Sequence, residues 1–255
     1  MADNALTGEV IGLVWDGTGY GTDGTTWGGE CLVGGYDNFS RVGSIRPIPL
    51  VGGDLVTKEP LRVTWALRRD AALPTEEENG ALYETMLQNG LNCPLSSGMG
   101  RLFDGVSAMI GVKTRCSYEG QGAILLEAAA TAADGLYPAE WEEENGILRF
   151  DWRGMIRAIE ADRINGVDRG VIAARFLNAL VDVGVRQCVR ARERSGLERV
   201  VLSGGSFQNM ILMHRLPAAL RREGFAVYHH RRVSTNDEGI SLGQLLIART
   251  ATERK

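Results

Sequence analysis

The chain has 255 residues and a formal net charge of −4 at pH 7, and its hydrophobic and charged fractions are those of an ordinary globular protein. It shows neither the basic surplus typical of nucleic-acid-binding proteins nor an apolar run long enough to cross a bilayer, so we expect no nucleic-acid or membrane partner. The sequence starts without a charged-then-apolar signal segment, which indicates the cytoplasm.

The first predicted elements are three short strands. Residues 10–15 are apolar and end at Asp16, and further strands are expected at residues 26–33 and 38–47. Short turns rich in Gly and Asp separate them, a pattern typical of an antiparallel meander.

The middle of the chain is predicted to be mostly helical, because apolar residues recur at helical spacing. The expected helices cover residues 61–69, 76–89, 101–110 and 121–133. An acidic loop is expected at 134–144, then a strand at 147–150, a helix at 153–162 and a long helix at about 168–194.

The end of the chain alternates between strand and helix. We expect strands at 199–202 and 225–228, and helices at 207–222 and 239–251. Pro217 is expected to split the first helix, since proline suits a first turn better than a helix interior. Three antiparallel strands followed by such units predict an α/β fold, with helices packed on a mixed sheet. Without a repeat or flexible linker, residues 1–255 are predicted to form a single domain with a helical insertion at about 54–196.

Glycine is over-represented, with 33 residues, nearly twice the usual share of about 7%. Residues 19–24 match the pattern G-x-G-x-x-G, but a dinucleotide fingerprint must open a helix, and here another strand follows. A hairpin whose backbone amides hold a phosphate is one interpretation, with Gly17, Thr18 and Gly19 as candidates. A plain Asp-Gly hairpin turn is the other, and the pattern does not decide between them.

Two aspartates are candidate metal ligands. Asp16 follows the first strand and Asp237 precedes the last predicted helix, positions where a carboxylate can hold a hard cation. Either residue could instead serve its own backbone, Asp16 within the turn and Asp237 as an N-cap. Nothing in the local sequence shows that the two meet.

Residues 203–209 join a strand to a helix through Gly204 and Gly205. A helix N-terminus offers free amides and a positive dipole, so we favour a phosphate or ribose site over a ligand-free turn. The three histidines form no metal-binding pair and are expected on the surface, and no nucleophile elbow supports hydrolase chemistry. The scattered cysteines form no C-x-x-C pair and are expected to be reduced thiols, mostly buried.

Several sequence blocks resemble, in the same order, those of the hydrogenase-maturation carbamoyltransferases of the HypF type. They cover almost the whole chain and read VIGLVWDGTGYGTDGTTWGGE (10–30), PLVGGD (49–54), EPLR (59–62), SGMGRLFD (97–104), YEGQ (118–121), LSGGSFQN (202–209) and NDEGISLGQ (236–244). Each block alone is weak, but together they are highly specific.

The resemblance implies the C-terminal, RNase H-like lobe of a transfer domain of the actin/Hsp70/sugar-kinase group, similar to the TsaD family. It implies transfer of a carbamoyl group from carbamoyl-adenylate, made with ATP, to the C-terminal cysteine of the partner HypE. By position, Asp16 and Asp237 would be ligands of a divalent metal (zinc, iron or magnesium). The positions that would contact the nucleotide are Asp104, Gly120, Gly204, Gly205 and Asn209. No catalytic residue is assigned.

The chain departs from the family in what it lacks. The family takes two histidine metal ligands from a segment just before the first strand of this lobe, and that segment and the N-terminal domains are missing from this sequence. We therefore expect those domains as partners and weak activity of the chain alone. The alternatives are an O-carbamoyltransferase lobe for a small-molecule acceptor and a non-catalytic module that binds nucleotide or docks a partner. A tRNA-modifying lobe is disfavoured by the acidic balance.

Overall fold

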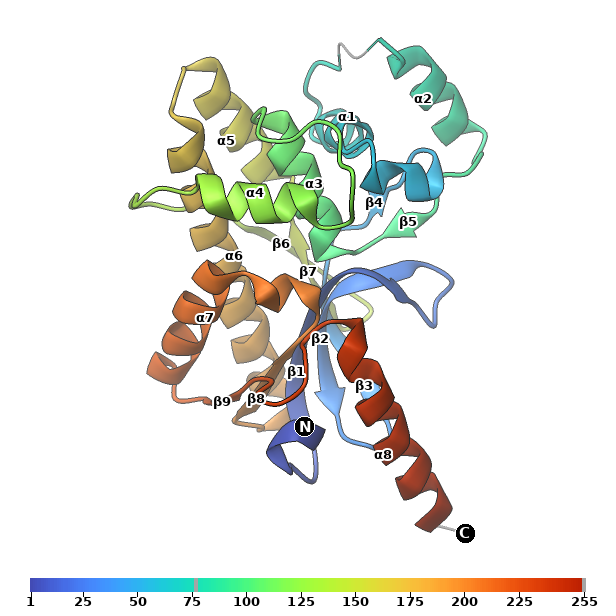
Figure 1. Ribbon diagram of the computed structural model, residues 1–255, viewed down its shortest axis with the longest axis vertical. Helices are drawn as coiled ribbons and strands as arrows, with labels where there is room; N and C mark the ends of the chain where they lie inside the picture. Colours follow the sequence, from blue (N-terminus) through green and yellow to red (C-terminus); the bar gives the residue numbers. More distant parts are fainter. Residues whose placement is uncertain (76–77, 254–255) are drawn as a thin grey trace.

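The computed structural model describes residues 1–75 and 78–253 (Figure 1). Its strands are β1 (Val10–Tyr20), β2 (Thr26–Gly34), β3 (Phe39–Ile45), β4 (Ile48–Pro49), β5 (Leu95–Ser96), β6 (Glu140–Glu144), β7 (Ile147–Asp151), β8 (Arg199–Ser203) and β9 (Ala226–Tyr228). Its α-helices are α1 (Leu61–Asp70), α2 (Gly80–Gln88), α3 (Met99–Met109), α4 (Gln121–Ala129), α5 (Arg153–Ile164), α6 (Arg169–Ser195), α7 (Met210–Arg222) and α8 (Ile240–Glu253). Short 3-10 helices are η1 (Ala2–Asn4), η2 (Gly53–Thr57), η3 (Gly205–Gln208) and η4 (Asp237–Gly239).

The described strands form a mixed sheet in the order β6-β7-β3-β2-β1-β8-β9, with β5 pairing both β2 and β4. β1, β2 and β3 pair antiparallel, which confirms the predicted meander. β8 lies parallel to β1, and β9 lies parallel to β8. The carboxyl end of β8 therefore lies beside the carboxyl half of β1, although about 190 residues separate Asp16 from Gly205.

The helices pack on this sheet and on one another around one apolar core. α6 contacts β1, β2, β3 and β7, and α3 contacts β1 and β2. Phe103 of α3 meets Phe176 of α6 edge to face, with ring centroids 5.2 Å apart, and both side chains are buried. α8 lies beside η1 and η4 and extends away from the sheet, with the C-terminus at its far end (Figure 1). Throughout the described part of the chain, each helix is too short or too polar to cross a bilayer.

Three predicted elements are wrong. The acidic loop at 134–144 contains β6, whose residues pair antiparallel with β7, so the insertion predicted as helical also holds strands. Its glutamates are compensated by distant arginines, as in the Glu143–Arg190 ion pair at 2.9 Å. Pro217 lies inside α7 without splitting it, where it is buried. The first strand continues past Trp15 to Tyr20.

Other boundaries shift by a few residues. The helix predicted at 76–89 is observed from Gly80, and its first two predicted residues lie outside the described residues. The helix predicted at 207–222 begins as η3 and becomes α-helical only at Met210. The predicted reduced thiols are confirmed, since all four cysteines are free and only Cys93 is not fully buried.

Candidate functional site

A bulge in β1 forms the centre of the site. The pairing of β1 with β2 shifts register between Trp15 and Gly19, so the segment from Asp16 to Thr18 leaves the regular ladder. The Asp16 carboxylate stabilises this departure, because Oδ1 accepts a 2.7 Å hydrogen bond from the amide of Gly17 and Oδ2 accepts a 3.0 Å bond from the amide of Gly205. Asp16 therefore joins the bulge of β1 to the loop that follows β8.

Glycines allow the backbone at this junction to approach closely. A Cβ on Gly98 would lie 2.1 Å from the carbonyl oxygen of Gly17, and one on Gly204 would lie 2.2 Å from that of Trp15. A Cβ on Gly17 would lie 2.9 Å from Nη2 of Arg101. At Gly98 and Gly204 the clashing atoms are backbone and cannot rotate away, so β1, the start of α3 and the loop after β8 come this close only with glycine at these two positions.

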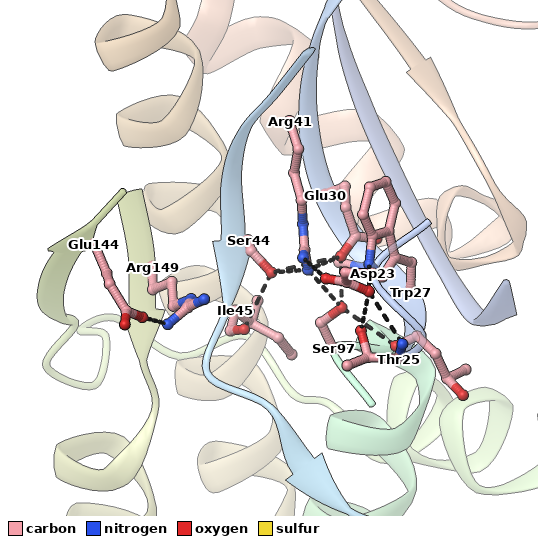
Figure 2. A network of polar contacts seen from close by, with 12 residues as sticks. Asp23, Thr25, Trp27, Glu30, Arg41, Ser44, Ile45, Ser97, Glu144 and Arg149 are labelled. Atoms are coloured by element: carbon pink, nitrogen blue, oxygen red, sulfur yellow. Dashed lines mark hydrogen bonds and ion pairs between the residues drawn. The ribbon is translucent and has the colours of Figure 1, made fainter. Parts of the chain in front are cut away.

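A buried polar network fixes the opposite side of the bulge (Figure 2). Oε2 of Glu30 accepts the amides of Gly28 and Gly29 at 2.5 and 2.7 Å, and Oε1 accepts hydrogen bonds from Ser97 at 2.5 Å and Arg41 at 2.8 Å. Burial raises the pKa of Glu30, and these donors oppose that rise. The network ties β2 to the start of α3 and so sets where α3 meets the bulge.

The bulge forms one wall of a cavity of about 450 Å³. Residues from five separate stretches of the chain line it. Of the predicted site residues, those in the lining are Asp16, Gly17, Thr18, Asp104, Gly120, Gly205, Asn209 and Asp237. Gly19 and Gly204 line a neighbouring cavity instead. The structure thus brings together most of the residues that the sequence singled out.

The charge of this cavity is mainly negative. Among the described residues that line it, Arg101 is the one positively charged side chain, against the carboxylates of Asp16, Asp104, Glu119, Glu127 and Asp237. Burial raises the pKa of Asp104 to about 6, although Arg101 nearby lowers it. The Asp104 carboxylate accepts no hydrogen bond from the described residues, so a ligand can supply its donors.

We expect Asp104 to make the stability of the protein depend on pH. Its pKa is raised from 3.8 to about 6, so the folded state binds the proton more tightly than the unfolded state. Its contribution is therefore fully present below pH 3.8 and is lost as the pH rises through 6. A shift of this size corresponds to about 3 kcal/mol.

Asp104→Asn removes this titration. The free energy of unfolding of the variant, minus that of the unaltered protein, should rise by about 2 kcal/mol between pH 4 and pH 7, the part of the full shift that falls in this range. Urea denaturation at several pH values measures it. Curves that stay parallel across this range would show that Asp104 does not titrate there.

The start of α7 does not offer the free amides that were predicted for it. Its amides were predicted to be free for a ligand, but Met210 donates to Oε1 of Glu127 at 2.7 Å, and Leu212 donates to Oδ1 of Asn209 at 3.0 Å. The amide of Gly205 is occupied by Asp16. The start of α7 therefore lines the cavity with Asn209, while its amides at Met210 and Leu212 are already hydrogen-bonded within the protein.

The predicted metal pair, Asp16 and Asp237, lines the same cavity. Within residues 1–75 and 78–253, no group of three or more His, Cys, Asp or Glu side chains is arranged to hold a metal ion. Both oxygens of Asp16 already accept backbone amides. The described residues therefore do not by themselves fit the zinc, iron or magnesium ion that the resemblance implies.

A second cavity of about 510 Å³ lies on the other side of this aspartate pair. It shares Asp16, Thr18, Asn236 and Asp237 with the first cavity, and much of its lining is apolar. His230 lines it and places Nε2 2.9 Å from Oγ of Ser203. Both histidines that were expected on the surface, His229 and His230, are half-buried here, whereas His214 is exposed.

Three charged residues in the lining of the first cavity were not predicted as site residues: Arg101, Glu119 and Glu127. Arg101 precedes Asp104 by one helical turn, so the shared face of a predicted helix could have revealed it. Glu119 directly precedes the candidate Gly120. Glu127 meets α7 only through tertiary packing, and no local pattern marks it.

Comparison with known proteins identifies close relatives of this chain. A family model described as the second subdomain of the Kae1-like domain of carbamoyltransferases matches residues 12–244. Carbamoyltransferase HypF of Synechocystis sp. is 33% identical over 96% of the chain and 35% of its own length. The carbamoyltransferase HypF homolog of Cupriavidus necator is 37% identical over 97% of the chain and 67% of its own length. The chain spans about a third of the Synechocystis protein.

A solved structure supports the same assignment. Full-length HypF in its phosphate- and nucleotide-bound form superimposes with a TM-score of 0.92 at 34% identity, over 98% of this chain and 34% of that one. The predicted resemblance and the predicted fold class are therefore confirmed.

Proposed function

The chain belongs to the HypF carbamoyltransferase family, and we propose that it is the part of a carbamoyltransferase that holds the nucleotide of an adenylate donor. The cavity of about 450 Å³ carries this proposal, because residues far apart in sequence meet there around glycines that leave room for a ligand. A relative of the same fold that was solved with bound nucleotide and phosphate supports a nucleotide as the occupant.

We propose carbamoyl-adenylate as the donor and the C-terminal thiol of a HypE-like protein as the acceptor. The thiol sulfur attacks the carbamoyl carbon, a C–S bond forms, the C–O bond to the AMP phosphate breaks, and the thiol proton is released. The contribution of this chain is to bind and orient the adenylate. Fixing the donor in this way lowers the barrier by making the attack effectively intramolecular.

Two features support the proposal that another part of the same enzyme packs against this chain. α8 exposes Ile240, Leu245 and Ile247 at 51–66% of their surface, and the second cavity beside it is lined largely by apolar groups. Since the matching family model describes a second subdomain, we infer that the first subdomain covers this face. Any divalent ion at Asp16 and Asp237 would take its remaining ligands from there.

The chain alone is expected to bind nucleotide but to transfer little. Calorimetry should show saturable binding of ATP. Incubation with ATP, carbamoyl phosphate and a HypE-like protein should leave the acceptor mass nearly unchanged, because we expect the first subdomain to complete the site. A complete enzyme of the family is the positive control.

Each other result points to a different function. Robust carbamoylation by the chain alone would contradict the proposal that the first subdomain is required. ATP binding without transfer, even when the first subdomain of a family member is supplied, would favour a non-catalytic module. Transfer to a small-molecule hydroxyl in place of the protein thiol would favour an O-carbamoyltransferase.

A further inference from the structure

Arg101 is the least expected residue of the cavity wall. Its side chain is only 2% exposed, and neither Nε nor Nη1 has a hydrogen-bond partner among the described residues. Burying a guanidinium with incomplete pairing costs folding free energy. A buried group that is left unsatisfied at a ligand cavity calls for an explanation beyond packing.

The contacts of Arg101 join three parts of the cavity. Nη2 lies 3.4 Å from Oδ2 of Asp104 on the same helix and 3.4 Å from Oε1 of Glu119 on the loop before α4. The same nitrogen packs against the bulge of β1, where a Cβ on Gly17 would lie only 2.9 Å from it. One cation therefore sets the distances between β1, α3 and the start of α4.

Arg101 also affects the ionisation of the neighbouring carboxylate of Asp104. Asp104 is buried and faces the charged or titratable groups of Arg101 on its own helix and of Glu119 and Cys116 on the following loop. Glu119 opposes ionisation of Asp104, and Arg101 favours it. The further carboxylates of the cavity are Asp16, Glu127 and Asp237. Arg101 is thus the one side chain in the described lining that offsets this negative charge.

We propose that Arg101 is a positioning residue of the nucleotide site, which holds Asp104 as an ionised acceptor and keeps it in register with Gly17. This inference rests on the proposed function, since it assumes that Asp104 contacts the nucleotide. An ionised carboxylate is a stronger hydrogen-bond acceptor than a protonated one. Loss of the cation should therefore weaken binding through Asp104 without any lost contact between Arg101 and the ligand.

The test compares Arg101→Met and Arg101→Lys with the unaltered chain, using ATP as the probe in calorimetry from pH 5 to pH 9. Arg101→Met should bind about tenfold more weakly at pH 7 and recover at pH 9, because a rise of about two units in the pKa of Asp104, from about 6, lowers its ionised fraction at pH 7 about tenfold and leaves it mostly ionised at pH 9. Arg101→Lys keeps the charge and should retain a pH profile close to that of the unaltered chain.

A second measurement needs no ligand and distinguishes an effect of Arg101 on the ionisation of Asp104 from misfolding of the variant. Carbon NMR of the Asp104 carboxyl should show its titration moving to higher pH in Arg101→Met and much less in Arg101→Lys. Arg190→Met, which removes a surface arginine paired with Glu143 and Glu193, is the matched control and should change neither readout.

The outcomes separate this proposal from the proposed function. ATP binding by Arg101→Met with an unchanged pH profile, or an unchanged titration of Asp104, would overturn the role of Arg101 while leaving the nucleotide site intact. Failure of the unaltered chain to bind ATP would instead remove the proposed function, and this role with it.

Discussion

Gly204→Ala is expected to destabilise the protein by about 3 kcal/mol or more and to abolish ATP binding. Gly204 has φ +105°, which side chains rarely adopt, and its Cβ would lie 2.2 Å from the carbonyl oxygen of Trp15 and 3.0 Å from the Trp15 amide nitrogen. All of these neighbours are backbone of β1, so no side-chain rotation relieves the clash. The loop must shift, and the hydrogen bond from Gly205 to Asp16 is lost with it.

Gly196→Ala provides the matched control. Gly196 caps α6 in the left-handed conformation at φ +72° and ψ 5°, and a Cβ added there would meet no atom within 4 Å, so this variant measures the cost of a left-handed backbone without a clash. That cost is about 1–2 kcal/mol. Thermal unfolding and calorimetry with ATP measure both variants. Equal stability losses, or retained binding in Gly204→Ala, would show that the contact between β1 and the loop after β8 is not needed.

Trp15→Ala should cost about 3–5 kcal/mol, a large part of the stability of a typical domain. The Trp15 side chain is fully buried and stacks on Phe207, with ring centroids 5.5 Å apart and planes at 12°. Trp15 directly precedes Asp16 and Phe207 lies two residues after Gly205, so this pair packs next to the junction that Asp16 forms. Chemical denaturation gives the change in free energy.

Trp15→Phe separates the contribution of aromatic packing to stability from that of the indole nitrogen. Nε1 of Trp15 is buried without a hydrogen-bond partner among the described residues, so its removal offsets part of the lost ring volume. The variant should lose far less stability than Trp15→Ala. A stability loss as large as that of Trp15→Ala would contradict this account of the indole nitrogen.

The fold could be predicted where local pattern and tertiary structure agree. The meander, the mixed sheet and most helices follow from apolar spacing and from Gly and Asp turns. β6 could not be predicted, because its residues are mostly glutamates and become a strand only where Arg149, Arg153 and Arg190 compensate them. The bulge at Asp16 depends on an amide of the distant Gly205, and no local sequence contains that information.

The residues of the site likewise divide into those that the sequence predicted and those that depend on tertiary packing. Family resemblance predicted residues that meet in one cavity, among them Asp104, Gly120 and Asn209. Sequence reasoning assigned phosphate-binding amides to the start of α7, but Glu127 of α4 accepts the amide of Met210, and Asn209 accepts that of Leu212. Capping by a residue of another helix depends on how α4 and α7 pack, so it becomes visible only in the folded chain.

The central claim, that the nucleotide lies between the β1 bulge and the start of α4, is tested most directly by amide NMR during titration with ATP. We expect shifts at Gly17, Gly120, Gly205 and Asn209, which line the first cavity, and little change at Gly35 and Val201, which line the second. Shifts centred on Gly35 and Val201, or no shifts at saturating ATP, would contradict the claim.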